Sequence, residues 1–309
     1  MAEVSVDITE QALMLGQDEA LAAIVTRPVM EAHAPAIIIL NTGVAHRVGH
    51  HRKFVTLSRR LARAGHTVVR FDFPGLGDSP AMTTDASLLE GNLFAIREVA
   101  NWIEQAFSID RIIMLGLCSG ADQSVIYAGR DTRVKGAILL DPSIPRTRRY
   151  HINDFSRRIR SRALWTNFLS GKGRIWDYTR SLFRKDGAVS VSSRQFSRPN
   201  LEHPEAISFL EGVYQGAIDN GVNLLGIFTA GQEYQHNYRT QIVDALPKVH
   251  FADRVSLHFL RDCDHTFIRE SYRNYMYSLV ADWLLSEFPD DRSPNHGVAS
   301  GDDIESMEF

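Results

Sequence analysis

Short apolar runs alternate with longer helical segments along most of the 309-residue chain. Several of these runs are continuously aliphatic, such as Ile37–Leu40 and Ile112–Leu115. Such runs are typical of strands whose two faces are both covered by helices. A repeated order of strand, helix and strand predicts a parallel sheet with right-handed crossovers. We therefore expect an α/β fold that is built on a mostly parallel, doubly wound sheet.

Eight segments have the length and composition of strands. They are Ala12–Leu15, Leu21–Val25, Ala36–Leu40, Thr67–Phe71, Arg111–Leu115, Val134–Leu140, Val222–Phe228 and Val255–Leu260. Six longer segments have apolar residues at helical spacing. They are Arg52–Ala64, Ser87–Phe107, Ala121–Gly129, Glu205–Asn220, Tyr238–Leu246 and Ile268–Phe288. A short connection joins the first two strands, so we expect them to form an antiparallel hairpin at one edge of the sheet.

A basic block interrupts this alternation after the sixth expected strand, where a crossover should be short. Residues 143–200 contain 14 lysines and arginines and only 3 acidic residues. A charge distribution this uneven indicates a separate module. We expect residues 1–142 and 201–288 to form the core, with residues 143–200 inserted as a basic helical cap. Residues 289–309 are acidic and lack periodicity, which predicts a disordered tail.

Composition excludes several classes of protein. Two cysteines are too few for a disulfide scaffold, and no apolar run reaches the roughly 18 residues that a membrane span needs. The net charge of −3 is too small to indicate a protein that binds nucleic acid. The first residues lack the basic start and the apolar core of a signal peptide, so we expect a cytoplasmic protein.

The segment after the fifth expected strand carries one reactive side chain between small residues. Gly116–Gly120 reads Gly-Leu-Cys-Ser-Gly, which fits the nucleophile-elbow pattern G-x-Nuc-x-G with Cys118 as the nucleophile. The glycines are needed because the turn is strained and a Cβ would crowd its neighbours. The following helix N-terminus favours a thiolate over a thiol. Ser119 is a poorer nucleophile candidate, since the pattern would then need glycine at Leu117 and Ala121.

A thiol nucleophile needs a base, and the base needs a group that orients it. His265 lies directly between the last expected strand and the last helix, so we expect it to be the base. In the elbow arrangement the carboxylate lies between nucleophile and histidine in chain order. Glu233, after the seventh strand, is the acid that we favour. Asp141, after the sixth strand, is the alternative.

The oxyanion of an acyl intermediate needs two convergent N–H donors. We expect one from Ser119, which follows the nucleophile, and one from Val44 in the loop after the third strand. Gly43 lets the backbone of that loop approach closely, and His46 in the same loop is expected to face the substrate. The three histidines of this loop lack metal-ligand spacing, so no metal is expected.

The turn after the fourth expected strand, Asp72–Ser79, is rich in glycine. It has no lysine in the Walker pattern, and its spacing does not match the dinucleotide fingerprint. We therefore expect no cofactor and interpret this segment as a structural turn that packs beside the elbow.

These features resemble the α/β-hydrolase fold superfamily over about residues 10–287. The resemblance rests on the Gly116–Gly120 elbow, the Phe71–Ser79 turn and Asp264–Phe267 before the last helix. The stretch Arg47–Arg52 is also similar to hydrolases found beside bacterial exosortase and polysaccharide gene systems. Most members of the superfamily use serine as the nucleophile. Dienelactone hydrolases and some carrier-protein thioesterases resemble this chain in using cysteine.

The resemblance implies an acyl hydrolase or acyltransferase with a Cys-His-Glu triad. Cysteine suits thioesters, since thiolate attack on a thioester is nearly thermoneutral and leaves an acyl-cysteine that reacts with water, amines or alcohols. The expected partner is a small-molecule acyl substrate. The basic cap is either a docking surface for an acidic acyl carrier protein or an anionic substrate, or a solvated pair of basic helices. Trp165 and Trp176 would face the substrate from the cap. The alternatives are a non-catalytic small-molecule binding protein, a simple carboxylesterase or lactonase, and a redox pair of Cys118 with Cys263.

Overall fold

The computed structural model describes residues 7–16, 20–30, 34–82, 85–160, 201–230 and 236–289. Within the helix that ends at residue 160, it describes no side chains for residues 157–160. The predictions for Glu233, Trp165 and Trp176 fall outside these residues, as do those for most of the basic block and for the acidic tail.

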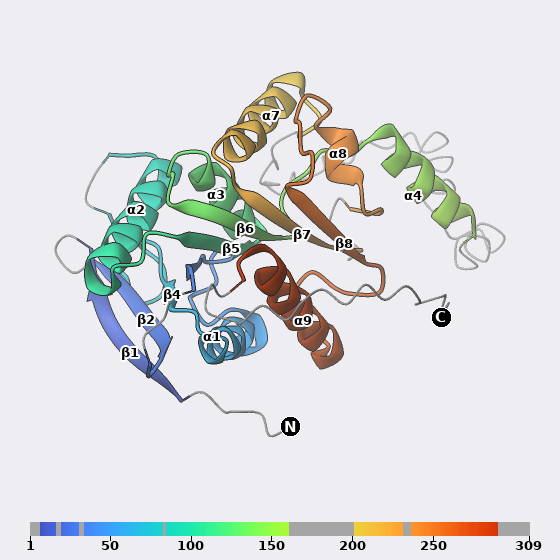
Figure 1. The fold of residues 1–309 in the computed structure, drawn as a ribbon. Helices are drawn as coiled ribbons and strands as arrows, with labels where there is room; N and C mark the ends of the chain where they lie inside the picture. The colour runs from blue at the N-terminus through green and yellow to red at the C-terminus, as the bar shows by residue number, and fades with distance from the viewer. Residues whose placement is uncertain are drawn as a thin grey trace, which may run out of the picture.

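Eight strands of the described residues form one mixed, mostly parallel sheet (Figure 1). They are β1 (Ile8–Leu15), β2 (Leu21–Pro28), β3 (Ala36–Ile39), β4 (Val68–Phe71), β5 (Ile112–Leu117), β6 (Val134–Leu140), β7 (Asn223–Thr229) and β8 (Val255–Leu260). Their order across the sheet is β1-β2-β4-β3-β5-β6-β7-β8. β2 runs antiparallel to β1 and to β4, and the pairs from β4 to β8 are parallel. The predicted fold class and the predicted edge hairpin are therefore confirmed.

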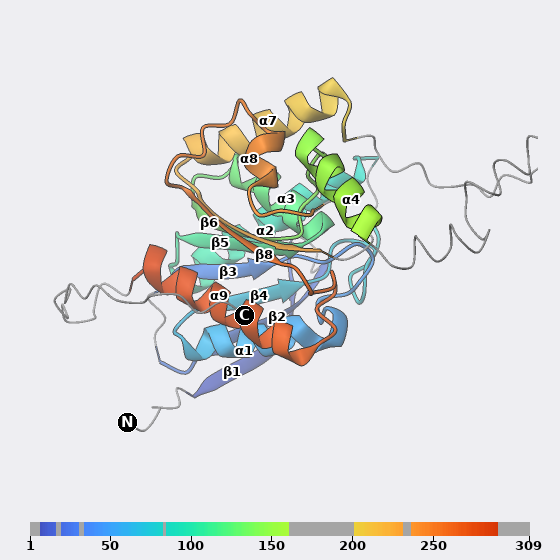
Figure 2. The same ribbon diagram turned by 90° about the vertical axis from the view of Figure 1, so that its right-hand side faces the viewer.

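Helices cover both faces of the sheet (Figure 2). The α-helices of the described residues are α1 (Lys53–Arg63), α2 (Leu88–Phe107), α3 (Ser119–Ala128), α4 (Arg148–Arg160), α7 (Pro204–Asp219), α8 (Gln241–Ala245) and α9 (Glu270–Glu287), of which α4 lies beyond the end of the sheet. One apolar core forms where α1 and α9 pack on the sheet, and a second forms on the opposite face under α2, α3 and α7. This is the doubly wound arrangement that the alternation of strands and helices predicted.

The central strands are buried along their whole length, as their continuous aliphatic runs predicted. Every residue of β3, β4 and β5 is buried. Each apolar side chain removed from water in this way contributes about 1.5–3 kcal/mol to folding. Because β3 and β5 to β8 are parallel neighbours, the loops after these strands meet at one edge of the sheet, which is where ligands bind in this architecture.

The start of the predicted insertion is attached to the core by polar contacts. Ser143 donates to the Asp122 carboxylate through its amide at 2.7 Å and through its hydroxyl at 2.6 Å. Farther along, the hydroxyls of Thr147 and Tyr238 lie 2.6 Å apart. α4 begins directly after this contact. Among the residues that the structure describes, no helix combines the length and the apolar character needed to span a membrane.

Candidate active site

Cys118 makes the connection between β5 and α3. β5 ends at Leu117 and α3 begins at Ser119, so the turn consists of one residue. Its backbone has φ 56° and ψ −122°, a conformation that residues other than glycine rarely adopt. The Cys118 amide donates to the Leu140 carbonyl at 2.9 Å, which ties the turn to the end of β6. The side chain is half-buried at the N-terminus of α3, where peptide N–H groups favour negative charge.

The two glycines that flank this turn are required by close backbone approaches. A Cβ on Gly116 would lie 2.1 Å from the carbonyl carbon of Gly120. A Cβ on Gly120 would lie 2.5 Å from the carbonyl oxygen of Asn41, in the loop after β3. Distances this short are excluded by sterics. The crowding predicted for the glycines of the elbow is therefore confirmed, with α3 as the neighbour on one side and the β3 loop on the other.

Asp141 and His265 form a buried pair at the same edge of the sheet. Asp141 directly follows β6 and is 1% exposed, while His265 follows β8 and is 8% exposed. His265 Nδ1 lies 2.9 Å from Asp141 Oδ2. The amide and the hydroxyl of Thr229 each donate to the Asp141 carboxylate at 2.5 Å. A carboxylate held by three partners has one orientation, and it fixes both the tautomer and the direction of the imidazole.

Asp141 was the alternative acid in the sequence interpretation, and the structure pairs it with His265. Glu233, the acid favoured from the sequence, lies outside the described residues. Both residues follow strands that end at the same edge, so chain order alone could not separate them. What distinguishes Asp141 is a non-local contact: the Cys118 turn is bonded to Leu140, the residue just before Asp141. Cys118, Asp141 and His265 thus lie at or just after the ends of β5, β6 and β8.

The loop after β3 brings one backbone amide against the elbow. The Gly43 amide donates to the Ser119 hydroxyl at 2.8 Å, and Gly43 has a positive φ of 54°. Ser119, predicted to supply the other amide of the oxyanion hole, is the first residue of α3. Gly43 is therefore the residue of this loop whose amide is bonded to the elbow, and the Val44 amide as an oxyanion donor stays a prediction. Val44, the residue predicted as the donor, has a side chain that is 89% exposed.

Asp72 holds the β3 loop in place, and sequence reasoning did not identify this role. Its fully buried carboxylate accepts from the Asn41 side chain at 3.1 Å and from the Arg47 amide at 2.6 Å. The Arg47 guanidinium also pairs with Asp72, and it reaches Asp78 at 2.6 Å. A Cβ on Gly77 would lie 2.1 Å from the carboxylate. The Phe71–Ser79 turn is thus a support for the loop beside the elbow.

Two further side chains near the pair were missed from the sequence. His236 is 4% exposed, and its Nδ1 lies 3.7 Å from the other oxygen of Asp141. Burial lowers the pKa of His236 to about 4, against the opposing effect of Asp141. Lys53, at the start of α1, is fully buried. A signal for Lys53 was present in the sequence, because it shares a helical face with Leu57 and Leu61.

His46, the residue predicted to face the substrate, lies on the exposed part of the β3 loop. Its Nδ1 is 3.4 Å from the amide of Val48. A contact with substrate therefore stays a prediction for this residue. Across the described ranges, no group of three or more His, Cys, Asp and Glu side chains is placed to hold a metal ion.

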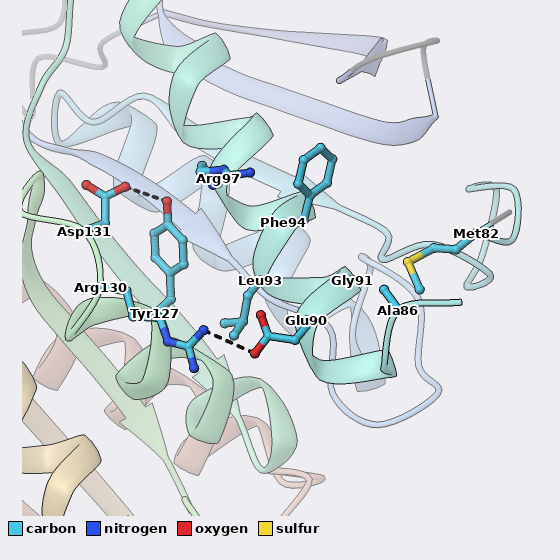
Figure 3. Close-up of a pocket in the computed structure, with 10 residues that line it drawn as sticks. All are labelled: Met82, Ala86, Glu90, Gly91, Leu93, Phe94, Arg97, Tyr127, Arg130 and Asp131. Atoms are coloured by element: carbon cyan, nitrogen blue, oxygen red, sulfur yellow. Dashed lines mark hydrogen bonds and ion pairs between the residues drawn. The ribbon is translucent and has the colours of Figure 1, made fainter. Parts of the chain in front are cut away.

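A cavity of about 520 Å³ opens between α2 and the C-terminal end of α3 (Figure 3). Its wall combines the apolar side chains of Leu93 and Phe94 with an ion pair of Glu90 and Arg130 at 3.3 Å. Cys118 lies before the other end of α3, and neither Cys118, Asp141 nor His265 contributes to the wall. The cavity is therefore separate from the candidate active site.

Comparisons with known proteins agree with this architecture. A family model described as the alpha/beta hydrolase fold matches residues 35–218, which is more than half of the chain. No significant sequence match is found among curated proteins.

Three solved structures illustrate the likeness. A proline iminopeptidase from Mycobacterium smegmatis has a TM-score of 0.50 and 17% identity, covering 90% of this chain and 98% of its own. A putative dienelactone hydrolase from Klebsiella pneumoniae has a TM-score of 0.53 and 14% identity, over 90% and 98% of the two chains. An esterase from Pyrococcus furiosus has a TM-score of 0.55 and 12% identity, over 92% of each chain. At these identities the likeness concerns the fold.

Proposed function

Because the chain belongs to the α/β-hydrolase fold family, we propose that it is an enzyme that hydrolyses or transfers an acyl group from a thioester or an activated ester. Cys118 is the nucleophile, His265 the general base and acid, and Asp141 the carboxylate that orients His265. The observation that carries this proposal is the one-residue turn at Cys118, between β5 and α3, which has a φ of 56°. This turn lies at the same edge of the sheet as the strand ends that carry the Asp141–His265 pair.

In the proposed first half-reaction, Cys118 Sγ bonds to the acyl carbon while its proton passes to His265 Nε2. Nδ1 of the same ring stays bonded to Asp141, whose negative charge stabilises the imidazolium that forms. The tetrahedral intermediate then expels the thiol or alcohol, which takes the proton back from His265. In the second half-reaction water, or another nucleophile, gives a proton to His265 and attacks the acyl-cysteine, and Cys118 regains its proton on release.

The oxyanion of each intermediate needs two amide donors, and we assign these to Gly43 and Ser119. The bond from the Gly43 amide to Ser119 Oγ supports Gly43 in place of Val44, because it directs the Gly43 N–H toward the elbow. Substrate binding would replace this hydroxyl with the acyl oxygen. Removal of one donor of this kind typically costs 2.7–4 kcal/mol of transition-state stabilisation.

A cysteine nucleophile favours thioesters as substrates. Its acyl-enzyme is itself a thioester, so the exchange from a thioester substrate is nearly thermoneutral, whereas attack on an unactivated ester or amide is uphill. The predicted acidic acyl carrier protein fits this chemistry as a donor, with the basic residues 143–200 as the docking region. The narrower similarity of Arg47–Arg52 to hydrolases beside exosortase and polysaccharide gene systems stays a prediction.

The test is turnover of acetyl-N-acetylcysteamine thioester and of 4-nitrophenyl acetate by matched cysteine variants. Cys118→Ala should lose at least about 1,000-fold in kcat/KM, since it removes the nucleophile. Cys263→Ala, the control, should keep activity within about threefold because that thiol is buried. Equal activity of Cys118→Ala and the wild-type protein would refute the proposed nucleophile. A higher kcat/KM of the wild-type enzyme for 4-nitrophenyl acetate than for the thioester would refute the expected preference for thioesters within the proposed substrate class.

A further inference from the structure

Lys53 is the first residue of α1, and its side chain has no exposure to solvent. Its Nζ lies 5.4 Å from the ring centroid of Phe54 and 5.6 Å from that of Phe267. Lysine is rarely buried to this degree without partners that stabilise its charge. A methionine would fill the same apolar space without the desolvation of an ammonium group. Packing alone therefore does not explain why a lysine occupies this position.

The contacts of Lys53 lead to the loop that carries His265. Lys53 Nζ donates to the carbonyl of Thr266 at 3.4 Å, and Thr266 directly follows His265. The Tyr277 hydroxyl of α9 donates to the Lys53 carbonyl at 3.0 Å. The start of α1, the loop after β8 and α9 therefore meet at this one residue.

The loop itself contains a strained backbone. Phe267 has a φ of 57°, which is unfavourable for an aromatic residue. Within the loop, the Asp264 carboxylate accepts from the Thr266 amide at 2.9 Å and from the Thr266 hydroxyl at 2.7 Å. Strain of this kind persists only where surrounding groups hold it. Lys53 supplies a contact to this loop from a different element.

Charged groups on several elements face Lys53. The carboxylates of Asp141 after β6 and Asp264 after β8 favour its protonated form. Arg273 of α9 opposes it, and His50, just before α1, also lies within electrostatic reach. Burial outweighs the carboxylates and lowers the pKa of Lys53 to about 8. The ammonium is therefore the main form at neutral pH and loses its proton in mildly alkaline solution.

We propose that Lys53 is a positioning residue, which holds the His265 loop in its catalytic conformation through the Thr266 carbonyl and through its charge beside Asp141. This inference rests on the proposed function for its effect on catalysis. Its effect on the loop can be measured without any substrate.

The test compares Lys53→Met with Lys135→Met. Lys135 is a matched control because its Nζ also donates to a backbone carbonyl, that of Thr132 at 2.8 Å. This hydrogen bond is exposed to solvent and lies at the start of β6. Lys53→Met should lower kcat about tenfold or more, because a small displacement of a general base has effects of this size. It should also speed amide hydrogen exchange at residues 264–268. Lys135→Met should change neither quantity.

Two further readouts separate positioning from a merely structural role. The lowered pKa of Lys53 means that the folded protein disfavours the ammonium, so burial of Lys53 destabilises the fold below about pH 8 and ceases to do so as pH rises toward 10.5. Lys53→Met should therefore melt no lower than the wild-type protein at pH 7, although it is less active. The ratio of wild-type to Lys53→Met kcat should fall as pH rises through about 8, where the wild-type ammonium loses its proton.

The proposal would be overturned if Lys53→Met had the same kcat as the wild-type protein and the same rates of amide hydrogen exchange at residues 264–268. A lower Tm accompanied by faster exchange throughout the core would also overturn it, because that pattern indicates a structural role. The proposed function would fail if Cys118→Ala retained turnover. That result would not affect the comparison of hydrogen exchange between Lys53→Met and Lys135→Met, which needs no substrate.

Discussion

The two cysteines of this chain lie in loops at the same edge of the sheet, in contrasting surroundings. Cys118 occupies the one-residue turn after β5, half-buried at the N-terminus of a helix. Cys263 follows β8, is 2% exposed, and donates from Sγ to the carbonyl of Asp264 at 3.3 Å. Burial, with the negative charges of Asp264 and Asp141, raises the pKa of the Cys263 thiol to about 12.

From this contrast we expect the reactivity of each sulfur atom to depend on the dipoles and charges around it more than on its place at the edge. Cys118 directly precedes the N-terminus of α3, which favours negative charge, whereas Cys263 has a carbonyl and two carboxylates near it. A redox pair of the two cysteines would need a thiolate to exchange. The raised pKa of Cys263 means that this thiolate would have to come from Cys118, and neither cysteine forms a disulfide bond in the structure.

Asp141 holds His265 in place, so its removal should lower activity strongly. Asp141→Asn leaves the shape of the site but removes the charge that orients His265 and stabilises its protonated form. We expect kcat to fall by at least about 100-fold. Glu233→Gln is the matched control and should keep activity within about threefold. Steady-state kinetics on the same thioester measure both, and the reverse result would return the role of the acid to Glu233.

The glycines beside the Cys118 turn should not tolerate replacement by alanine, whereas a glycine on an open helix face should. In Gly116→Ala the new Cβ would meet the Gly120 backbone at 2.1 Å, so we expect a loss of about 3 kcal/mol or more in the free energy of unfolding. Gly212 of α7 has nothing within 4 Å of the equivalent position, so Gly212→Ala should stabilise the fold by roughly 0.5–1 kcal/mol. Urea denaturation of the two variants measures this difference. Equal stabilities would mean that the turn is looser than the structure indicates.

Alkylation by iodoacetamide compares the two sulfur atoms directly. We expect Cys118 to react at least about tenfold faster than Cys263 at pH 7, because thiolates are the reactive form and Cys263 is both buried and protonated. The rate for Cys263 should keep rising up to about pH 12, where its thiol loses the proton. Peptide mass mapping after timed quenching follows each site. Faster labelling of Cys263 would contradict the contrast between the two loops.

The fold could be predicted from the sequence because local patterns determine most of it. Val134–Leu140 and Val255–Leu260 were predicted with the bounds that β6 and β8 have in the structure. The Cys118 turn was also readable, because glycine on both sides of a reactive residue between strand and helix is a local signature.

The parts of the site that depend on contacts between distant segments could not be read in this way. Which carboxylate meets His265 depends on the neighbours of β6 in the sheet, and chain order does not specify that. Lys53 shares a helical face with Leu57 and Leu61, which indicates a buried side of α1, but its contact with Phe267, more than two hundred residues later, could not be read from this pattern. The support that Asp72 gives to the β3 loop is non-local for the same reason.

The most direct test of the central claim is to locate the acyl group on the enzyme during turnover. The wild-type protein is mixed with acetyl-N-acetylcysteamine thioester, quenched in acid within the first turnovers, digested and mapped by mass spectrometry. We predict a single acetyl group on Cys118, which accumulates more slowly in His265→Ala and is absent from Cys118→Ala. An acetyl group on Ser119, or turnover without any acyl-enzyme, would contradict Cys118 as the nucleophile.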